Sequence, residues 1–567
     1  MIFKKLCIVA VAMLSYHSQA QDFDWVRSFG SAGYNQGQSV AVDAGGNVYA
    51  TGSFSGTADF DPGAGVSNLN SVGDVDVFVS KLDASGNLIW AKSFGGLTND
   101  YGQCVKADQQ GNVYVTGWFH GTVDFDPGPG TFTLSSNGNY DAFILKLDPT
   151  GNFLWAGGFG GGTSSNSGQS LALDQAGNVY VTGYFLGTAD LDPGAGTFNL
   201  VSAGSNDVFI SKFDASGNLV WAKSIGGTGS DRGLAIAVDA LGNVYTAGHF
   251  ESTVDFDPGP ATYTLITASL TDVFISKLDA SGNFVWAKNM GGIDYDTAES
   301  MAVDAAGNVY TTGRFGFMGN APDFDPGPGT YTLAPAGGYD IFVSKLNASG
   351  NFVWAQKIGS AGDDYGNSIV LDPQGNPYVT GRFSGTVDFD GGPATYTMAS
   401  VGGADVFVIR LDAAGNLVWS RSVGGMGDDV AYSIGFNAGS VYLTGSFMGM
   451  VDFDPGPGSF NLSAVSTGAD IFILKLKPLE TGLQDDPEKM TADLHCYPNP
   501  GNGSLNIQFS ANAHLQMLNS LGQVVKTIEL NAGNDYQTVL EGLASGMYYL
   551  TGQTSRGVIN QKIVVAN

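Results

Sequence analysis

The chain has 567 residues, of which 53 are Asp or Glu and 24 are Lys or Arg, so its formal net charge is −29. This charge argues against nucleic acid partners, whose phosphates require a basic surface, and against adsorption to anionic lipid. Apolar residues make up 43% of the chain, which is enough to build a large core and excludes wholesale disorder. A chain of this length is expected to fold as more than one domain.

Residues 1–20 have the pattern of a secretory signal peptide. Two lysines precede an apolar run over residues 6–14, and small residues occupy the positions before a cleavage site at Ala20. We therefore expect the mature chain to begin at Gln21; a buried N-terminal strand is the alternative. No other stretch approaches the roughly 20 apolar residues of a spanning helix, so no transmembrane segment is predicted.

One unit repeats seven times over residues 21–477. An Asp-x-Asp pair recurs at intervals of about 65 residues, and each unit also carries a recurring Trp and an Asp-x-Phe segment; only Trp118 is an additional Trp. A fixed period of this kind indicates stacked or radial supersecondary units. The repeated pairs are Asp59 and Asp61, Asp124 and Asp126, Asp190 and Asp192, Asp255 and Asp257, Asp323 and Asp325, Asp388 and Asp390, and Asp452 and Asp454.

Each unit has the pattern of four antiparallel strands. In the first complete unit these are residues 39–43, 48–54, 76–82 and 88–94. A Gly-Asn turn joins the first strand to the second, and another joins the third to the fourth. Gly and Asn tolerate positive φ, so Gly-Asn between alternating apolar runs predicts a tight hairpin. Four-stranded units repeated radially are the blades of a β-propeller. The sequence thus predicts an all-β fold with a seven-bladed β-propeller over residues 21–477.

The ends of the repeat region predict that the ring closes. The last unit lacks its Trp strand after residues 470–476, and the missing strand stands at residues 24–30. We expect this N-terminal strand to complete the seventh blade, because doing so covers an edge that would otherwise recruit other chains. A linear solenoid is the alternative, but it requires capping repeats that the sequence lacks. The small-residue strands, such as 39–43, should line the axis, and the repeated Trp residues should pack between blades.

Alternating strand direction assigns the loops to two faces. Both Gly-Asn hairpins of a unit fall on one face, whereas the long loops after the second strand and the connections between units fall on the other. Functional residues usually lie on loops held by a rigid scaffold, so the second face is the candidate binding surface. Besides the fourteen repeated Asp residues it carries further acids in the connections, which are Asp100, Asp231, Asp294, Asp296, Asp363, Asp364, Asp428 and Asp429.

Two interpretations of the Asp-x-Asp-Pro-Gly loops remain open. In the first loop Asp59 and Asp61, with backbone carbonyls, could supply hard oxygen ligands to Ca²⁺, although a complete EF-hand-like series is absent. Alternatively, each Asp bonds its own backbone in an Asx turn, Pro62-Gly63 sets the bend, and Phe60 fills the core. Calcium is the one cofactor that the sequence suggests, with all fourteen Asp residues as its candidate ligands.

Catalytic motifs are sparse. The sequence has no zinc-ligand spacing, no Gly-x-Ser-x-Gly and no phosphate-binding loop that opens a helix, so no catalytic residue is assigned. His120 and His249, near the ends of second strands, are expected to be exposed histidines at loop edges. Cys104 and Cys496 are expected to be independent buried thiols. Histidines stand outside the signal segment at His120, His249, His495 and His514, none at a repeating position.

The period stops after residue 477. Residues 478–493 are polar and unpatterned, as in a linker, and residues 494–567 contain short alternating strands typical of a small β-sandwich. Cys496-Tyr-Pro-Asn-Pro-Gly-Asn-Gly, Asn519-Ser-Leu-Gly-Gln, Leu543-Ala-Ser-Gly-Met-Tyr-Tyr and the final Lys-Ile-Val-Val resemble the type A C-terminal sorting domain of the type IX secretion system of Bacteroidetes. The resemblance implies that the type IX machinery is a partner and that the protein is secreted or displayed on the outer-membrane surface.

The repeat units, with Asp-x-Phe-x-x-Lys-x-Asp-x-x-Gly-Asn-x-x-Trp, resemble the bacterial SBBP-type β-propeller repeat, which implies a fold and not an activity. The sequence therefore predicts a monomeric binding or adhesion protein that presents an acidic loop face to extracellular glycan, protein or calcium. One alternative is a carbohydrate-active propeller enzyme, a hydrolase or lyase, that uses a carboxylate pair near the axis. Another is a structural component of a surface layer.

Overall fold

The computed structural model describes most of the repeat region and the strands of the C-terminal region. Contacts divide the chain into two compact units, Met1–Pro478 and Leu479–Asn567. The expected signal peptide and nearly all of the expected linker lie outside the described residues. The described residues are 21–478 without 163–164, 393 and 466–467, together with 495–497, 504–508, 513–519, 524–530, 537–541, 543–554 and 557–565.

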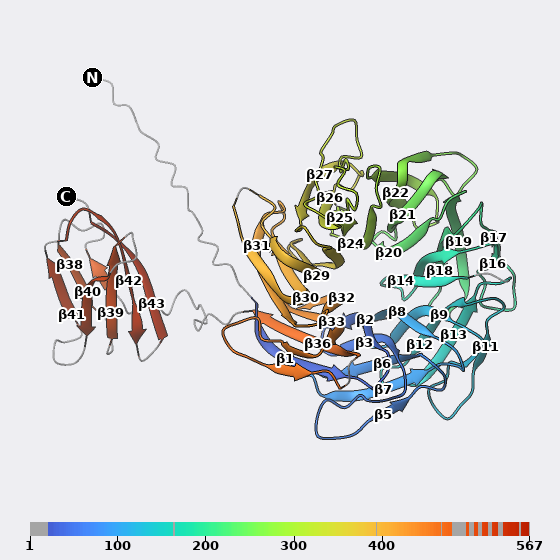
Figure 1. Ribbon diagram of the computed structural model, residues 1–567, viewed down its shortest axis with the longest axis horizontal. Helices are drawn as coiled ribbons and strands as arrows, with labels where there is room; N and C mark the ends of the chain where they lie inside the picture. Colours follow the sequence, from blue (N-terminus) through green and yellow to red (C-terminus); the bar gives the residue numbers. More distant parts are fainter. Residues whose placement is uncertain are drawn as a thin grey trace. The chain divides into compact units, whose positions relative to one another are not determined.

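The first unit consists of antiparallel four-stranded ladders arranged around an axis (Figure 1). From the inner strand outward, the first ladders are β2 (Asn35–Val42), β3 (Val48–Phe54), β6 (Asp76–Leu82) and β7 (Leu88–Phe94), then β8 (Tyr101–Ala107), β9 (Val113–Phe119), β12 (Asp141–Leu147) and β13 (Phe153–Phe159). Next come β14 (Ser167–Leu173), β15 (Val179–Phe185), β18 (Asp207–Phe213) and β19 (Leu219–Gly227), then β20 (Arg232–Val238), β21 (Val244–Asp255), β22 (Thr264–Leu278) and β23 (Phe284–Met290).

The ladders continue with β24 (Thr297–Val303), β25 (Val309–Phe315), β26 (Asp340–Leu346) and β27 (Phe352–Ile358), then β28 (Tyr365–Leu371), β29 (Pro377–Asp388), β30 (Thr397–Leu411) and β31 (Leu417–Gly425). The remaining ladder is β32 (Val430–Asn437), β33 (Ser440–Met448), β36 (Ala469–Pro478) and β1 (Gln21–Phe29). Short strand pairs extend some loops: β4 (Thr57–Asp59) with β5 (Asn68–Asn70), β10 (Thr122–Asp124) with β11 (Thr133–Ser135), β16 (Thr188–Asp190) with β17 (Asn199–Val201), and β34 (Met450–Asp452) with β35 (Asn461–Ser463).

The inner strands surround the axis. Neighbouring inner strands contact each other in the cyclic order β2, β8, β14, β20, β24, β28, β32 and back to β2. Serine side chains link them: Ser39 Oγ accepts the N–H of Val105 at 3.2 Å. Ser433 Oγ likewise accepts the N–H of Val40 at 3.1 Å, across the junction between the last ladder and the first. The serines of these strands therefore also supply hydrogen bonds between neighbouring ladders.

The hydrogen-bonded sheets do not coincide one for one with the predicted blades. Gly226 and Gly227 of β19 pair with the far end of β21, which joins two ladders into an eight-stranded sheet. β31 pairs similarly with β34, which gives a six-stranded sheet. The arrangement is all-β and propeller-like, with no helix among the described residues. Because two of these sheets combine strands of neighbouring units, the number of sheets does not confirm seven blades. The count of seven blades stays a prediction.

The N-terminal strand occupies the outer position of the last ladder. β1 pairs antiparallel with β36, with Trp25 opposite Lys475 and Phe29 opposite Ile471. Trp25 is buried, and its Nε1–H donates to the carbonyl of Ala84 in the next ladder at 3.2 Å. Equivalent bonds run from Trp90, Trp221, Trp286 and Trp354 to the following ladders. The repeated Trp residues thus pack between ladders, as the sequence predicts.

The second unit contains two sheets over one core. β37 (His495–Tyr497), β38 (Ser504–Gln508) and β41 (Gln537–Glu541) form one sheet, and β40 (Val524–Leu530), β39 (Ala513–Asn519), β42 (Gly546–Thr554) and β43 (Gly557–Val565) form the other. Leu505, Leu515 and Leu550 belong to the shared apolar cluster. Among the described residues of the chain, no helix has the length and apolar character needed to cross a membrane.

Candidate functional site

The Asp-x-Asp loops lie beside the outer strands and hold their own backbone. Asp59 Oδ1 accepts the N–H groups of Asp61 at 3.0 Å and Ser67 at 2.8 Å, while Asp61 Oδ1 accepts the N–H of Gly63 at 2.8 Å. Phe60 between them is fully buried. The same bonds recur in the other six loops, at Asp124 and Asp126, Asp190 and Asp192, Asp255 and Asp257, Asp323 and Asp325, Asp388 and Asp390, and Asp452 and Asp454.

This geometry is the one that the Asx-turn interpretation requires. One oxygen of each Asp is used by backbone N–H groups, which leaves the other oxygen for solvent or for a cation. No group of three or more His, Cys, Asp or Glu residues suited to a metal ion occurs in the part of the chain that the structure describes. Calcium binding by the fourteen Asp residues therefore stays a prediction.

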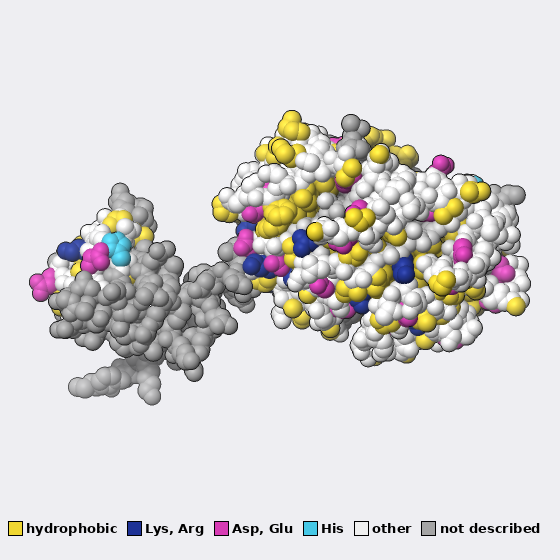
Figure 2. All heavy atoms as spheres, turned by 90° about the horizontal axis from the view of Figure 1, so that it is seen from below, with side chains coloured by type: hydrophobic (Ala, Val, Ile, Leu, Met, Phe, Trp, Pro, Cys, Tyr) yellow, Lys and Arg dark blue, Asp and Glu magenta, His cyan; other side chains and the backbone are white. Residues whose placement is uncertain are grey.

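The acids in the connections between ladders are mostly buried, and this corrects the expectation that they create an acidic face. Asp100 has no exposed surface; its Oδ2 accepts the N–H of Gly96 at 2.7 Å, and its Oδ1 accepts that of His120 at 2.9 Å. Asp363 and Asp428 are exposed, but each accepts a backbone N–H. In the side view of Figure 2, acidic side chains are scattered among uncharged surface. The buried members are Asp100, Asp231, Asp294, Asp296, Asp364 and Asp429.

Each of five connecting acids lies beside the Asp that begins a third strand. The backbone N–H of Asp100 donates to the carbonyl of Val75, the residue before Asp76. Burial raises the pKa of Asp100 to about 7, and the charge of Asp76 adds a smaller effect in the same direction. Burial is also the largest cause of the raised pKa of Asp76. The equivalent pairs are Asp207 with Asp231, Asp272 with Asp296, Asp340 with Asp364 and Asp405 with Asp429.

One position in the second strand of each ladder does not follow the repeat. In every unit this position lies between a Gly and a Phe, as Ser53 lies between Gly52 and Phe54. A Cβ on these glycines would stand 1.8–2.0 Å from a backbone carbonyl of the inner strand, and the Phe rings are buried, so packing fixes both neighbours. The residue between them is free to vary. The seven residues are Ser53, Trp118, Tyr184, His249, Arg314, Arg382 and Ser446.

The cross-strand partners of these residues, at or next to the start of each inner strand, also vary. Residues directly opposite in an antiparallel pair share one face of the sheet, so each pair forms one side-chain unit. We call these fourteen residues the axial mouth; they lie on the face that carries the long loops. The partners, in the same order, are Gln36, Tyr101, Ser167, Arg232, Thr297, Tyr365 and Val430.

One sector of the axial mouth is aromatic. Trp118 lies between two tyrosines, with ring centroids 4.5 Å from Tyr101 and 4.6 Å from Tyr140. Tyr34 continues the row at 5.9 Å from Tyr101 and is 40% exposed. Tyr34, Tyr101 and Trp118 line a cavity of about 260 Å³. The rest of its lining comes from Gln36, Gln38, Ser53, Gly102 and Gln103.

The adjoining sector is cationic. The Arg232 guanidinium lies 4.5 Å from the centroid of Tyr184, and that of Arg382 lies 4.2 Å from the centroid of Tyr365. Arg314 lies over the same Tyr365 ring at 5.0 Å. Burial and then the charges of Arg232 and Arg314 lower the pKa of His249 to about 3, so this side chain is neutral. The expectation that His249 is an exposed loop-edge histidine is not met, because the residue is only partly exposed and its Nδ1 is buried.

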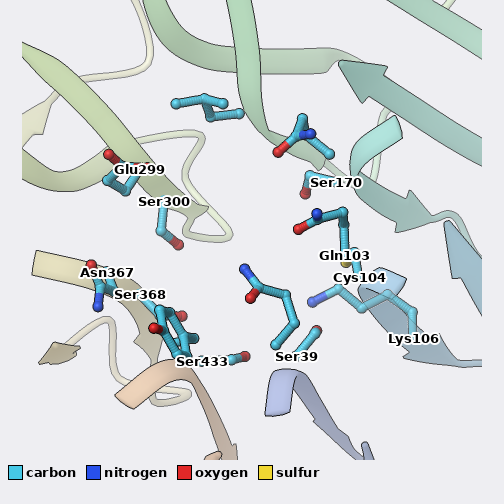
Figure 3. Close-up of a pocket in the computed structure, with 14 residues that line it drawn as sticks. Ser39, Gln103, Cys104, Lys106, Ser170, Glu299, Ser300, Asn367, Ser368 and Ser433 are labelled. Carbon is cyan, nitrogen blue, oxygen red and sulfur yellow. The ribbon is translucent and has the colours of Figure 1, made fainter. Parts of the chain in front are cut away.

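An axial cavity of about 180 Å³ is continuous in its lining with the aromatic sector, since Gln38 and Gln103 line both. Figure 3 shows its serines, amides and Lys106 arranged around the axis. Glu299 is the one carboxylate among the described residues that line it, and it pairs with Arg314 at 3.4 Å. Burial raises the pKa of Glu299, although Arg314 opposes this. The lining supplies no second carboxylate near the axis.

Sequence reasoning missed the axial mouth. It treated Trp118 as an extra Trp and His249 as an isolated histidine, because neither belongs to the period. The available signal was the contrast at one position, which holds five residue types in the seven units between a Gly and a Phe that never change. Between two neighbours that packing fixes, this variation, shared by the cross-strand partners, suggests a role outside folding.

Comparisons with known proteins identify two modules. Residues 495–566 match the family model described as a secretion system C-terminal sorting domain, and residues 353–382 match that of a β-propeller repeat, the SBBP repeat. The chain thus carries a type IX sorting domain, which directs it to secretion or to attachment at the cell surface.

Curated relatives are distant and longer. The chain is 24% identical over 503 residues to an uncharacterized WD repeat-containing protein of Acanthamoeba polyphaga mimivirus, covering 75% of this chain and 36% of that protein. It is 31% identical over 173 residues to the regulatory protein FlaEY of Caulobacter vibrioides, covering 30% of this chain and 17% of that one. It therefore spans about a third or less of their lengths. A crystal structure of rhamnogalacturonan lyase YesW is 12% identical over 96% of this chain and 91% of that one, with a TM-score of 0.21.

Proposed function

We propose that this chain is a secreted or cell-surface binding protein whose ligand site is the axial mouth of a closed, seven-bladed propeller. The propeller comprises residues 21–477, and residues 494–567 serve export. The four-stranded ladders and the cyclic contacts of their inner strands support the count of seven and the closure. In this proposal the protein acts as a monomer that presents one face to an extracellular glycan or protein.

The observation that carries the proposal is the variable position of the axial mouth. Binding sites are concave and combine apolar surface with a few polar groups that converge on the ligand. Here aromatic rings, arginines and an amide occupy structurally equivalent places around one axis, and the cavity of about 260 Å³ opens beside Gln36, Tyr101 and Trp118. A scaffold that repeats everywhere else supplies the rigidity that such a site needs.

The enzymatic alternative receives less support. Most glycoside hydrolases use two carboxyl groups that flank the scissile bond. Glu299 stands alone in the lining of the axial cavity and is held by Arg314. The carbohydrate-active enzyme therefore stays an untested alternative, and turnover of a polysaccharide that is abolished by Glu299→Gln would favour it over the binding protein.

Matched variants of the full chain test the binding proposal. Trp118→Ser and Tyr184→Ser install the residue that the fold already accommodates at Ser53 and Ser446, so the fold should persist. We expect both variants to lose the signals that the unchanged protein gives on a glycan array. Ile89→Ser, which removes an exposed apolar side chain of β7, is the control and should keep them. Retention of binding by both mouth variants would contradict the proposal.

A further inference from the structure

The axial mouth contains unpaired cations in a strongly acidic protein. Arg232, Arg314 and Arg382 come from three successive ladders around the axis, although acids outnumber bases by 53 to 24. Arg314 has Glu299 as a partner at 3.4 Å. Among the described residues, neither Arg232 nor Arg382 forms an ion pair with a carboxylate. Most Lys and Arg side chains of the described residues also lack such a partner, so it is the gathering of three arginines around one mouth that distinguishes this sector.

Two buried polar atoms in the same sector lack hydrogen-bond partners. They are Nε of Arg232 and Nδ1 of His249, which occupy a directly opposed pair on β20 and β21. Burying a polar atom without a partner is costly, and such atoms in a folded protein call for an explanation. The Nε–H of Arg232 can only donate a hydrogen bond, so the group that would satisfy it is an acceptor, and a carboxylate is the strongest such acceptor for a guanidinium.

The guanidinium groups of this sector lie over tyrosine rings. Arg232 lies over Tyr184, and both Arg314 and Arg382 lie over Tyr365. A guanidinium stacked on a ring keeps its N–H edge free, and this edge matches a carboxylate in a bidentate geometry. The same stacking argues against a cationic ligand, because the ring faces that would attract it are already covered by arginines.

The neighbouring sector has the chemistry for sugar rings. The cavity of about 260 Å³ is lined by the amides of Gln36, Gln38 and Gln103 and by exposed aromatic surface at Tyr34. Amides donate to and accept from hydroxyl groups, and aromatic rings pack against the C–H faces of pyranoses. Aromatic and amide groups beside a row of stacked arginines form a continuous surface for a chain of hydroxylated rings that carry carboxylates.

We propose that the axial mouth binds an acidic polysaccharide, with uronate carboxylates held by Arg232 and Arg382 and the sugar rings lying over the aromatic sector. This inference rests on the proposed function, since it names the ligand class of the same site. An acidic peptide would also meet the arginines, but it would leave the amide-lined cavity and its aromatic wall without matching groups.

The experiment compares charged and neutral forms of the same polymers. The full chain is titrated calorimetrically with polygalacturonate, alginate and hyaluronate, each beside its carboxyl-reduced, neutral form. We expect at least one acidic polymer to bind, its reduced form to bind at least tenfold more weakly, and binding to weaken as NaCl rises from about 50 to about 500 mM. Failure of all three acidic polymers, or equal binding of the neutral forms, overturns the inference.

Variants locate the site and separate the two proposals. Arg232→Ser reproduces Ser167, and Arg382→Ser reproduces Ser53 and Ser446, so both should fold; each should weaken binding at least tenfold. Lys223→Gln, which reproduces Gln356 on an outer strand and removes the same charge, should change nothing. Unchanged binding in both Arg variants overturns the inference. Binding of a neutral glycan or a peptide that Trp118→Ser abolishes would overturn the acidic ligand while leaving the proposed function intact.

Discussion

Replacement of Asp100 by Asn should change how the stability of this protein depends on pH. Asp100 and Asp76 are both buried, and Oδ1 of Asp76 has no hydrogen-bond partner. In the next ladder Asn166 stands where Asp100 stands, and its Nδ2–H donates to Asp141 Oδ1 at 3.0 Å. A proton shared between Asp76 and Asp100 would supply the bond that the amide supplies there. The five Asp pairs should therefore each retain one proton near neutral pH.

The sign of the effect follows from the raised pKa. Asp100 has a pKa of about 7 in the folded protein against 3.8 as its ordinary value. Between these values the folded state holds a proton that the unfolded state has released, so stability falls as pH rises through this window. One such group contributes about 1.4 kcal/mol per pH unit, or about 4 kcal/mol across the window. The protein should be more stable near pH 5 than near pH 8.

The variants isolate one pair at a time. Asp100→Asn should reduce the slope of unfolding free energy against pH by about 1.4 kcal/mol per pH unit, and Asn166→Asp, which creates a sixth Asp pair, should increase it by a similar amount. Asp279→Asn is the control. Hydrogen bonds from Asn283 lower the pKa of Asp279, and Asn347 already occupies the equivalent place.

Urea unfolding measured at several pH values between about 5 and about 8 gives the slopes. The control variant should have the slope of the unchanged protein, since Asp279 titrates below this range. A protein that gains stability from pH 5 to pH 8, or an Asp100→Asn variant with an unchanged slope, would refute the reasoning about shared protons.

Three further outcomes are expected. If the Asp-x-Asp loops hold calcium, EDTA lowers the Tm and added Ca²⁺ restores it; an unchanged melting curve would count against metal at these loops. Asp59→Ala removes the acceptor of two backbone N–H groups and should cost about 1–3 kcal/mol by thermal unfolding, and a Tm equal to that of the unchanged protein would contradict the Asx-turn role. Trp25→Ala should cost about 3–5 kcal/mol and promote self-association visible by light scattering, because it loosens β1 from the edge of β36; a stable monomer would be the contrary result.

Local chemistry that repeats was predictable from the sequence. The hairpin turns follow from Asp-x-x-Gly-Asn: Asp43 Oδ1 accepts the N–H of Asn47 at 2.9 Å, and Gly46 adopts a φ of 82°. The pairing of the N-terminal strand with β36 follows from a strand missing at one end and present at the other. In both cases the residues that determine the structure are close in sequence or recur in every unit, so the pattern of one unit predicts the structure of the others.

The site was not predictable, because its determinants are neither local nor repeated. The buried carboxylate of Asp100 accepts hydrogen bonds from the N–H groups of Gly96 and His120. These two residues belong to different segments that only the fold brings together. Counting carboxylates on a face therefore overestimated its exposed charge. The contact of Arg232 with Tyr184 joins two neighbouring ladders, and no period marks it.

Hydrogen–deuterium exchange of the full chain, with and without a bound acidic polysaccharide, tests the central claim most directly. The account predicts new protection at the starts of β8, β20 and β28 and around Trp118 of β9, His249 of β21 and Arg382 of β29, where the axial mouth lies. Protection confined to the Asp-x-Asp loops or to the Gly-Asn hairpins, with none at these positions, would contradict it.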